Sequence, residues 1–321
     1  MKYPILKAVV AGLGLMVSLN AASAAEDGAG VGEEHWTFGG IRGHFDRPQL
    51  QRGFQVYKEV CSTCHGVKRL SFRNLSEKGG PQFPEEGVKG LAATYKVNDG
   101  PNDQGKMFKR PGRASDRIPP PFDNDQQARS ANNGALPPDL SLMARARSAE
   151  AEKPFYLVPW SMLRDIFISG GYQEGGADYI HALLTGYQEK ASAYRNDNGH
   201  LVMVSEAEAG NLPRCASVTK GDPGQPDVCN KMADGMSYNT TFPGHQIAMP
   251  PPLRDGVVKY GDGTPATMDN YSRDVTAFLA WAADPKLEER KRLGMMTMAY
   301  LLITALLLYL AKRRVWEGEA H

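Results

Sequence analysis

The sequence is poor in cysteine and nearly devoid of long hydrophobic runs, and both shortages narrow the class of protein. Its 321 residues include only four cysteines, so it is not a small disulfide-rich secreted domain. The mean hydropathy of −0.43 excludes a polytopic membrane protein. With 41% hydrophobic and 23% charged residues, the chain has the composition of an ordinary folded protein.

Neither sign of charge dominates the chain, which has 37 basic and 36 acidic residues. Two basic residues lie in positions 1–25, and seven basic and four acidic residues follow position 285. The segment 26–285 therefore holds 28 basic and 32 acidic residues, a net charge of about −4. A mildly acidic body does not suit nucleic acid, but it would suit a basic protein partner.

Two of the cysteines stand in the run C-S-T-C-H at 61–65, which is the spacing of c-type haem attachment. A thioredoxin-like pair would need a βαβ context, and a zinc site would need a second Cys/His pair at ligand spacing. Neither is present in the sequence. We therefore expect one covalent haem c, with thioethers from Cys61 and Cys64 and with His65 as the proximal iron ligand.

The first 25 residues have the pattern of a secretory signal peptide. Lys2 and Lys7 precede an apolar run from Ala8 to Leu19, and small residues follow at 22–24. The alternative is an uncleaved N-terminal anchor. The cleavage bond, before Ala25 or before Glu26, stays open.

Near the other end, the residues from Leu293 to Ala311 include no charged side chain. At about 1.5 Å per residue a helix of this length spans roughly 28 Å, close to the thickness of the bilayer core. The alternative is a buried core helix. Basic residues flank the segment on both sides, so the positive-inside rule alone leaves the orientation ambiguous.

The signal peptide resolves that ambiguity and gives the expected organisation. We expect the haem domain in the periplasm and the C-terminus in the cytoplasm, with the chain held in the bacterial inner membrane. The predicted parts are a signal peptide (1–25), a periplasmic haem c domain (26–285), a membrane anchor helix (286–314) and a cytoplasmic tail (315–321).

The other two cysteines, Cys215 and Cys229, lie outside the haem motif in a stretch rich in glycine and proline. In an oxidising compartment they are expected to form a disulfide. Closing a loop of about 15 residues would stabilise the fold by up to roughly 3 kcal/mol. We expect this disulfide to be structural.

A first helix is predicted from Pro48 to Cys64, with Asp46 as its N-cap. Leu50, Phe54, Tyr57 and Cys61 form its apolar stripe. The small residue Gly53 would let this helix cross the last helix of the domain closely.

A second helix is predicted from Asp269 to Asp284, capped by Thr267. Tyr271, Val275, Phe278, Leu279 and Ala282 form its apolar stripe. We expect Asp284 to cap the membrane helix in turn, with Pro285 at its first position.

The chain between the two helices is mostly loop, since residues 79–140 are crowded with Gly, Pro, Asn and Asp. An apolar island at 155–168 predicts a further helix after Pro159, for packing or for a partner or membrane contact. We expect a mainly α fold in which the haem supplies the missing core.

The second axial ligand decides between electron transfer and small-molecule chemistry. His35, His44, His181, His200 and His245 are candidates, as are several methionines. Met249 is favoured because it precedes three prolines, which would present its side chain rigidly. His245 is its rival.

Several longer runs carry a resemblance to a known family. The chain resembles the cytochrome c1 family, the membrane-anchored haem subunits of the ubiquinol–cytochrome c oxidoreductase (cytochrome bc1) complex. The runs are R-G-F-Q-V-Y-K-E-V-C-S-T-C-H (52–65), N-D-G-P-N-D-Q-G-K-M-F-K-R-P-G (98–112), A-N-N-G-A-L-P-P-D-L-S (131–141), L-L-T-G-Y (183–187), F-P-G-H-Q-I-A-M-P-P-P-L (242–253) and D-G-T-P-A-T-M (262–268). Their order and spacing cover nearly the whole mature chain.

The resemblance implies a class I c-type cytochrome domain with long loop insertions and one C-terminal transmembrane helix. It implies that Met249 is the sixth iron ligand and that Arg147 and Tyr179 touch the haem or its propionates. Asn132 and Pro138 match haem-pocket positions. A surface salt bridge for Arg147 and a core role for Tyr179 remain alternatives.

The sequence departs from the shorter family members in two places. Residues 148–175 form an insertion with no assigned role, which stretches the spacing between Arg147 and Tyr179. Residues 188–240 resemble the disulfide-bearing insertion of some bacterial relatives.

The resemblance implies an electron carrier rather than a stand-alone catalyst, a subunit that does not itself bind quinol. Its expected partners are cytochrome b, the Rieske iron–sulfur protein as electron donor, and a soluble or membrane-anchored c-type cytochrome as acceptor. Two alternatives stay open. One is a tethered periplasmic c-type cytochrome serving another redox complex, and the other is a haem peroxidase with an open sixth position.

Overall fold

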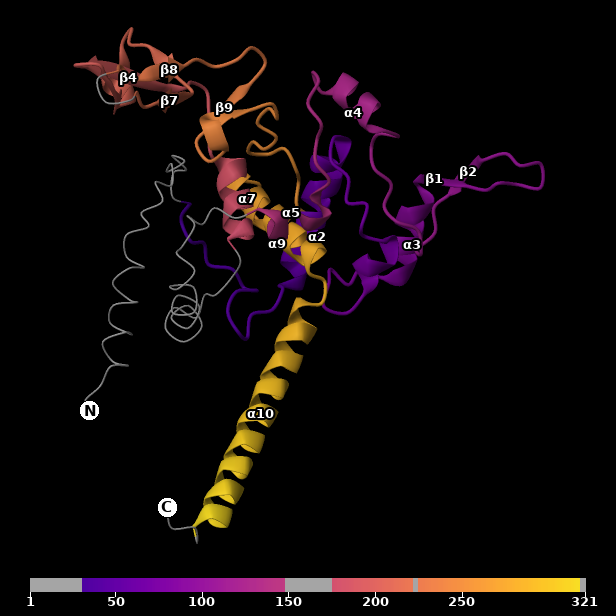
Figure 1. The fold of residues 1–321 in the computed structure, drawn as a ribbon. Helices are drawn as coiled ribbons and strands as arrows, with labels where there is room; N and C mark the ends of the chain where they lie inside the picture. Colours follow the sequence, from indigo (N-terminus) through magenta and orange to yellow (C-terminus); the bar gives the residue numbers. More distant parts are fainter. Residues whose placement is uncertain (1–30, 148–174, 222–224, 318–321) are drawn as a thin grey trace, which may run out of the picture.

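The computed structural model describes residues 31–147, 175–221 and 225–317. Short helices, loops and small sheets form a body at one end of the long helix α10 (Figure 1). The α-helices are α2 (Arg47–Glu59), α3 (Glu85–Ala93), α4 (Asp125–Ala131), α5 (Met143–Ala146), α7 (Gly176–Thr185), α8 (Glu206–Ala209), α9 (Met268–Ala283) and α10 (Leu287–Trp316). Short 3-10 turns are η1 (Cys61–Thr63), η2 (Phe72–Ser76), η3 (Leu140–Leu142) and η5 (Pro243–His245).

Helices α2 and α9 cross at the centre of the body, and a glycine in α2 makes the crossing close. A Cβ placed on Gly53 would lie 2.0 Å from the carbonyl oxygen of Asp274 and 2.8 Å from Cβ of Phe278. The expected role of Gly53 is therefore confirmed. Arg52, its neighbour, donates two hydrogen bonds to the buried carboxylate of Asp274 at 2.8 and 3.2 Å. This charge-assisted pair reinforces the crossing.

The hydrophobic core surrounds this crossing and is rich in aromatic rings. Phe54 and Tyr57 of α2 pack on Phe278 of α9, with ring centroids 5.6 and 5.7 Å apart. Trp281, one turn further along α9, also packs on Phe278, with ring centroids 5.6 Å apart. The predicted apolar stripes are confirmed except at Cys61, which is partly buried and lies beyond the end of α2. The other stripe residues are all buried: Leu50, Phe54, Tyr57, Tyr271, Val275, Phe278, Leu279 and Ala282.

Helix α2 has the predicted N-cap, begins at Arg47, one residue before the predicted start, and ends earlier than predicted. The Asp46 carboxylate accepts a hydrogen bond from the Gln49 N–H at 3.0 Å and caps the helix. The α-helix stops at Glu59, and the chain tightens into the 3-10 turn η1. The N–H of His65 still reaches the Cys61 carbonyl at 2.9 Å. The haem motif therefore sits on a tight turn that continues α2, rather than in the helix itself.

The predicted start of the membrane helix is wrong by two residues. Helix α10 begins at Leu287, with Lys286 at its N-cap. Asp284 does not cap it, because its carboxylate accepts hydrogen bonds from Arg145 and Arg290 and its N–H closes the end of α9. Thr267 caps α9 as expected.

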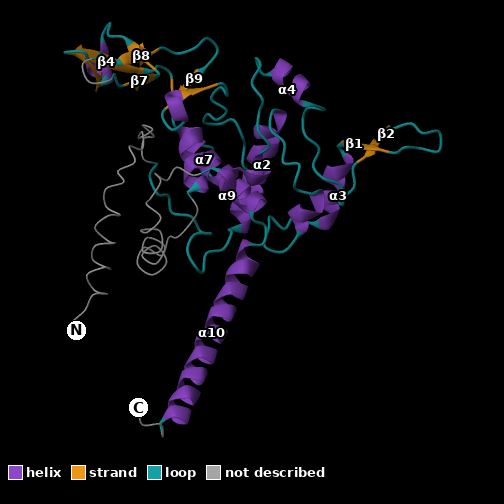
Figure 2. Cartoon of the chain, viewed as in Figure 1, coloured by secondary structure: helices purple, strands orange, loops and turns teal. Residues whose placement is uncertain are grey.

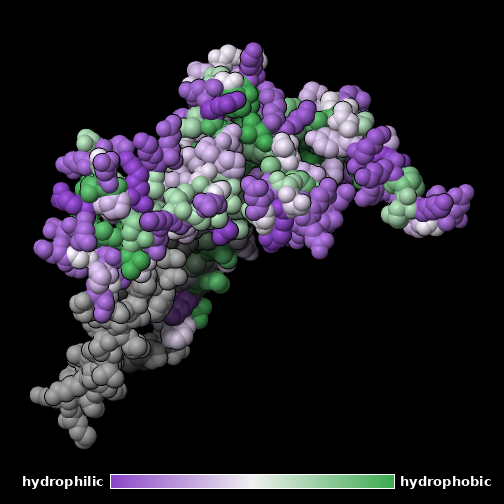
Figure 3. Space-filling model, turned by 90° about the horizontal axis from the view of Figure 1, so that it is seen from above, coloured by the Kyte–Doolittle hydropathy of each residue, from purple (hydrophilic) through white to green (hydrophobic). Residues whose placement is uncertain are grey.

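Helix α10 is long and apolar enough to cross a membrane. It has 30 residues and contains an 18-residue stretch with a mean hydropathy of 2.0. None of that stretch is buried in the body. Its length of about 45 Å exceeds the roughly 30 Å of a bilayer core. The face of the body opposite α10 is mainly hydrophilic (Figure 3).

The described residues also contain ten strands, so the expected mainly α fold is not confirmed. The strands lie at the two ends of the body, and the helices fill its centre (Figure 2). The antiparallel pair β1 (Lys96–Asp99) and β2 (Phe108–Pro111) projects beyond α3. These strands, with α3 and α4, give residues 79–140 more regular structure than their composition indicates. A small antiparallel sheet has β9 (Ser237–Asn239) between β10 (Gln246–Ile247) and β3 (Tyr187–Gln188).

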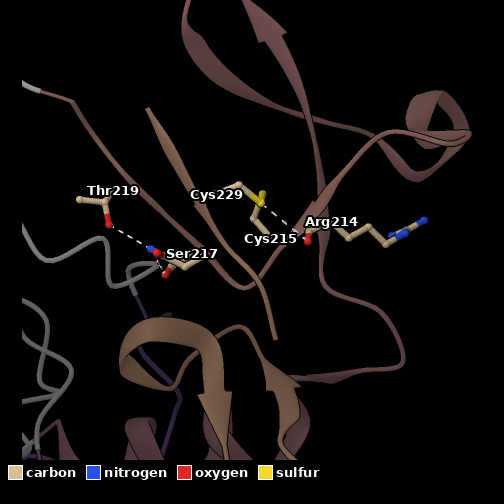
Figure 4. The surroundings of a disulfide bond; sticks show 6 residues. Arg214, Cys215, Ser217, Thr219 and Cys229 are labelled. Atoms are coloured by element: carbon tan, nitrogen blue, oxygen red, sulfur yellow. Dashed lines mark hydrogen bonds between the residues drawn. A yellow bond between two sulfur atoms is a disulfide. The ribbon is translucent and has the colours of Figure 1, made fainter. Parts of the chain in front are cut away.

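At the other end lies the disulfide lobe, which we define as the described residues from 192 to 230. It contains β4 (Ser192–Asp197) between β5 (His200–Val204) and β6 (Arg214–Cys215), and the pair β7 (Ser217–Thr219) and β8 (Val228–Asn230). The predicted disulfide is confirmed, since Cys215 and Cys229 join β6 to β8 (Figure 4). The Asn230 amide also donates to the hydroxyl groups of Ser217 and Thr219 on β7.

Three predictions fall outside the described residues. They are the signal peptide at 1–25, the helix after Pro159 in the apolar island 155–168, and the insertion at 148–175 apart from its last residue.

Replacing Gly53 with alanine should strongly destabilise the body. The new methyl group would collide with the α9 backbone, and overpacking of this kind costs ~1–3 kcal/mol or more. We expect a large fall in the thermal unfolding midpoint of the full chain in detergent, followed by circular dichroism.

Gly87 in α3 provides the matched control. A Cβ there meets nothing within 4 Å, so the helix should gain about 0.5–1 kcal/mol from Gly87→Ala. Equal midpoints for the two variants would contradict a close α2–α9 crossing.

Candidate functional site

The turn that follows α2 brings His65 against a backbone carbonyl. His65 Nδ1 lies 2.8 Å from the carbonyl oxygen of Pro138. Because a carbonyl oxygen only accepts, Nδ1 must carry the proton, which leaves the lone pair on Nε2. Burial lowers the pKa of His65, although the Pro138 carbonyl acts in the opposite direction. The lowered pKa favours the neutral imidazole, whose Nε2 lone pair can ligate a metal.

The segment that supplies this carbonyl is itself tied to the chain beyond His65. Asp139 Oδ2 accepts a hydrogen bond from the N–H of Lys68 at 2.9 Å, and Asp139 Oδ1 accepts one from the N–H of Ser141 at 3.0 Å. The Ser141 hydroxyl oxygen accepts from the N–H of Arg69 at 3.1 Å. Residues 138–141 and 65–69 therefore form one rigid unit, which we name the proximal clamp.

Side chains and backbone on either side of His65 complete the proximal clamp. The Tyr57 hydroxyl donates to the His65 carbonyl at 3.1 Å, and the Leu140 N–H donates to the Gly66 carbonyl at 2.8 Å. A Cβ on Gly66 would lie 3.3 Å from both Asp139 Oδ2 and Cβ of Pro120. A larger residue after His65 would therefore have to displace these neighbours slightly.

The donor set of this turn fits a covalently attached haem. Cys61 and Cys64 are both free and partly buried, and burial raises the pKa of the Cys61 thiol to about 12. Leu136 and Leu142, on either side of the clamp, expose 37% and 40% of their surface. Two unpaired thiols, an imidazole with a free Nε2 and nearby uncovered leucines are what attachment of an apolar macrocycle requires.

A second group of candidate residues lies around Met249. The Tyr187 hydroxyl donates a hydrogen bond to the Met249 carbonyl at 3.1 Å. Burial raises the pKa of Tyr187, and Tyr179 adds to that rise, so the hydroxyl keeps its proton and remains a donor. Burial also raises the pKa of Tyr179, while the guanidinium of Arg147 opposes it. Arg147 and Tyr179, like Tyr179 and Tyr187, are thus near enough to interact electrostatically. Tyr187 is the residue that contacts Met249 directly.

Tyr187 is a site residue that the sequence analysis missed. It is the last residue of L-L-T-G-Y at 183–187, one of the runs that carry the family resemblance. Nothing in that run indicates a contact with a carbonyl 62 residues further along the chain.

Two of the predicted pocket residues act differently from a simple side-chain contact. Pro138 contributes through its carbonyl group rather than through its ring. The Asn132 amide donates to the Ala128 carbonyl at 2.7 Å and closes the end of α4. Asn132 thus shapes the loop that leads to Pro138.

The rival histidines have other partners. His181 is buried, with Nδ1 2.9 Å from the Ser272 hydroxyl and Nε2 3.6 Å from Asp269 Oδ1. His245 Nδ1 lies 3.2 Å from the Asn239 carbonyl. His35, His44 and His200 are exposed.

Removing the Asp139 carboxylate should loosen the proximal clamp. Asp139→Ala leaves the N–H groups of Lys68 and Ser141 without these acceptors, and hydrogen bonds to a charged group contribute about 1.5–3 kcal/mol each. We expect a clear fall in the thermal unfolding midpoint of the full chain. Asp103→Ala, which changes an exposed carboxylate in the β1–β2 turn, should leave the midpoint unchanged. Equal effects of the two substitutions would contradict the clamp.

Comparison with known proteins gives one consistent result. Residues 36–319 match the model of the Cytochrome C1 family. The chain is 39% identical over 327 residues to "Cytochrome c1" of Rhodospirillum rubrum, covering 99% of each chain. It is 44% identical over 313 residues to "Cytochrome b/c1" of Bradyrhizobium diazoefficiens, which is 98% of this chain but 39% of that longer protein. It is 36% identical over 299 residues to "Cytochrome c1, heme protein, mitochondrial" of Schizosaccharomyces pombe, covering 93% and 76% of the two chains.

The family model spans most of the chain, and the relatives match it almost from end to end. The expected covalent haem c and the electron-transfer role of a bc1-type haem subunit are thereby confirmed. The chain belongs to the cytochrome c1 family.

Proposed function

We propose that this chain carries single electrons from the Rieske iron–sulfur protein to a soluble or membrane-anchored c-type cytochrome, beside cytochrome b in a bc1 complex. The observation that supports this most directly is the hydrogen bond from His65 Nδ1 to the Pro138 carbonyl. A histidine fixed through one ring nitrogen offers the other to iron in a constant orientation. A carrier needs such constancy, because little should rearrange when the electron arrives or leaves.

The proposed ligand set is His65 below the iron and Met249 above it, with Cys61 and Cys64 as the thioether links. When bound, the haem supplies a one-electron couple, and a thioether ligand favours its ferrous form. Two features of this chain present the Met249 side chain. Tyr187 holds its carbonyl group, and the three prolines at 250–252 restrict the backbone after it.

The remaining pocket residues would hold the edges of the macrocycle. Arg147 lies near enough to Tyr179 to affect its pKa, and both side chains are suited to pairing with carboxylate groups such as propionates. Leu136 and Leu142 would be covered and would help to exclude water from the iron. Asn132 and Pro138 act through the loop and the proximal clamp.

We propose that the α2–α9 crossing is the frame of a class I c-type cytochrome domain within residues 26–285. The haem motif follows the first of the two crossing helices directly. Helix α7 packs on α9 beside them, while the hairpin β1–β2 and the disulfide lobe lie at the periphery (Figure 1). The strands would then be additions to a helical frame.

The start of α10 supports a periplasmic body and a cytoplasmic tail. At the body end, the Lys291 ammonium donates to the Phe38 carbonyl at 2.6 Å, and Arg290 binds Asp284. Glu288 accepts a hydrogen bond from the N–H of Phe45 at 2.8 Å. Three of the four basic residues on this side, Lys286, Arg290 and Lys291, thus have partners in the protein. Residues 312–314, in contrast, follow the span as an uninterrupted basic run. Uncompensated basic charge favours the cytoplasmic side, after export directed by the leader at 1–25.

The proposed partnership with cytochrome b agrees with the longer Bradyrhizobium relative, whose name joins cytochrome b with c1. A carrier serving a different complex would not copurify with cytochrome b, which separates these two readings. A peroxidase is less well supported. His245, the histidine nearest to Met249 in the sequence, has a backbone carbonyl as its partner.

Redox titration of the full chain in detergent tests the proposed ligand set. The wild type should show a high midpoint potential, and Met249→Leu should lower it sharply because the thioether ligand is lost. His245→Asn should leave the potential near that of the wild type.

A low potential that Met249→Leu does not move would remove Met249 as a ligand. A sharp fall caused by His245→Asn alone would assign the sixth position to that histidine instead.

A further inference from the structure

An open cavity of about 680 Å³ lies beside the haem-attachment turn. Its walls come from the end of α2, from the β1–β2 hairpin and from residues 116–123. This volume is within the roughly 300–1,000 Å³ of typical small-molecule sites. None of Cys61, Cys64, His65 and Met249 lines the cavity, so it is separate from the proposed haem pocket.

Basic side chains dominate the rim of this cavity. Lys68, Lys96, Lys109 and Arg117 line it, and within the described part of the chain none of them forms an ion pair. Strand geometry explains how two of the lysines converge. Lys96 and Asn98 lie two residues apart on one face of β1, and Lys109 of β2 pairs directly with Asn98.

The two carboxylates of the cavity do not cancel this charge. Asp116 is held by Arg110 through two hydrogen bonds of 2.6 and 3.0 Å, and by the N–H of Arg113 at 2.7 Å. The negative charge of Asp116 is therefore paired with Arg110, which does not line the cavity. Among the lining residues, Asp123 is then the one carboxylate left to balance the four basic side chains. The cavity is a cationic site in a body that carries more acidic than basic residues.

The floor of the cavity is apolar and aromatic. Tyr57 and Ile118 are 3% and 4% exposed, and Tyr95 is half-buried beside them. The prolines at 119–121 add flat hydrocarbon surface. Cationic rims above aromatic floors suit ligands that combine an anionic group with an apolar body.

The cavity also adjoins the proximal clamp. The Tyr57 ring lines it while the Tyr57 hydroxyl binds the His65 carbonyl. Pro120, another lining residue, lies beside Gly66, since a Cβ added to that glycine would meet it at 3.3 Å. A negative charge held in the cavity would therefore lie close to the haem-attachment turn, where it favours the more positive ferric state.

We propose that this cavity binds a small soluble organic anion, a phosphate or carboxylate attached to an apolar or aromatic body, and that the bound anion lowers the haem reduction potential. A soluble ligand is favoured over a lipid because the β1–β2 hairpin lies well away from α10 (Figure 1). The proposal rests on the covalent haem and does not depend on which residue is the sixth ligand.

The test is a redox titration of the full chain in detergent with phenyl phosphate as the probe, at constant ionic strength. We expect a saturable fall in the midpoint potential. A tenfold preference of the probe for the ferric form would correspond to about 59 mV. Calorimetry on the same samples measures the affinity independently of the haem, and phenyl phosphate should bind more tightly than inorganic phosphate because its ring meets the apolar floor.

Two variants make the test specific. Lys96→Gln/Lys109→Gln should weaken phenyl phosphate binding at least tenfold and remove the fall in potential. Lys231→Gln, an exposed lysine of the chain at the far end of the body, should bind as the wild type does.

Absence of saturable binding, or equal affinity in the double-lysine variant, would overturn the site. Saturable binding with no change in potential would overturn its coupling to the haem. Equal affinity for phenyl phosphate and inorganic phosphate would overturn the assignment of an apolar ligand body. Each of these outcomes leaves the effect of Met249→Leu as it was, so the two proposals fail separately.

Discussion

The carbonyl group of Pro138 is the constraint on which the site depends. It fixes both the tautomer and the position of His65, and its own position is set by Asp139 and Ser141. The same segment continues through η3 and α5, which pack on α9. Because α9 crosses α2 at Gly53, the haem-attachment turn is held from two directions, by α2 along the chain and by α9 through the clamp.

This arrangement also connects the site to the membrane helix. Helix α9 leads into α10 at Asp284, whose carboxylate binds Arg145 from the clamp side and Arg290 from α10. The contacts of Glu288 and Lys291 with the backbone at 38–45 fix the first turns of α10 against the body. The proposed iron site is therefore kept at a constant height and orientation relative to the membrane, as suits a carrier that receives and delivers electrons through partners.

Sequence reasoning succeeded where the signal is local or carried by side-chain identity. The haem motif, the Asp46 and Thr267 caps, the role of Gly53 and the disulfide all follow from short patterns. It failed where long-range pairing decides. The strands have two to six residues and exist only through their partners. Asp284, which was predicted to cap α10, instead binds two arginines through its carboxylate.

The two contacts that define the site most sharply were the hardest to predict from the sequence. The Pro138 and Met249 backbone carbonyls act as acceptors, and a carbonyl is common to every residue.

The central claim is that His65 and Met249 together ligate the iron. Proton NMR of the reduced full chain tests it most directly, because a methionine methyl group held over a diamagnetic haem is shifted far upfield by the ring current. The account predicts one such methyl resonance, absent in Met249→Leu, and a reduced wild-type protein without it would contradict the claim.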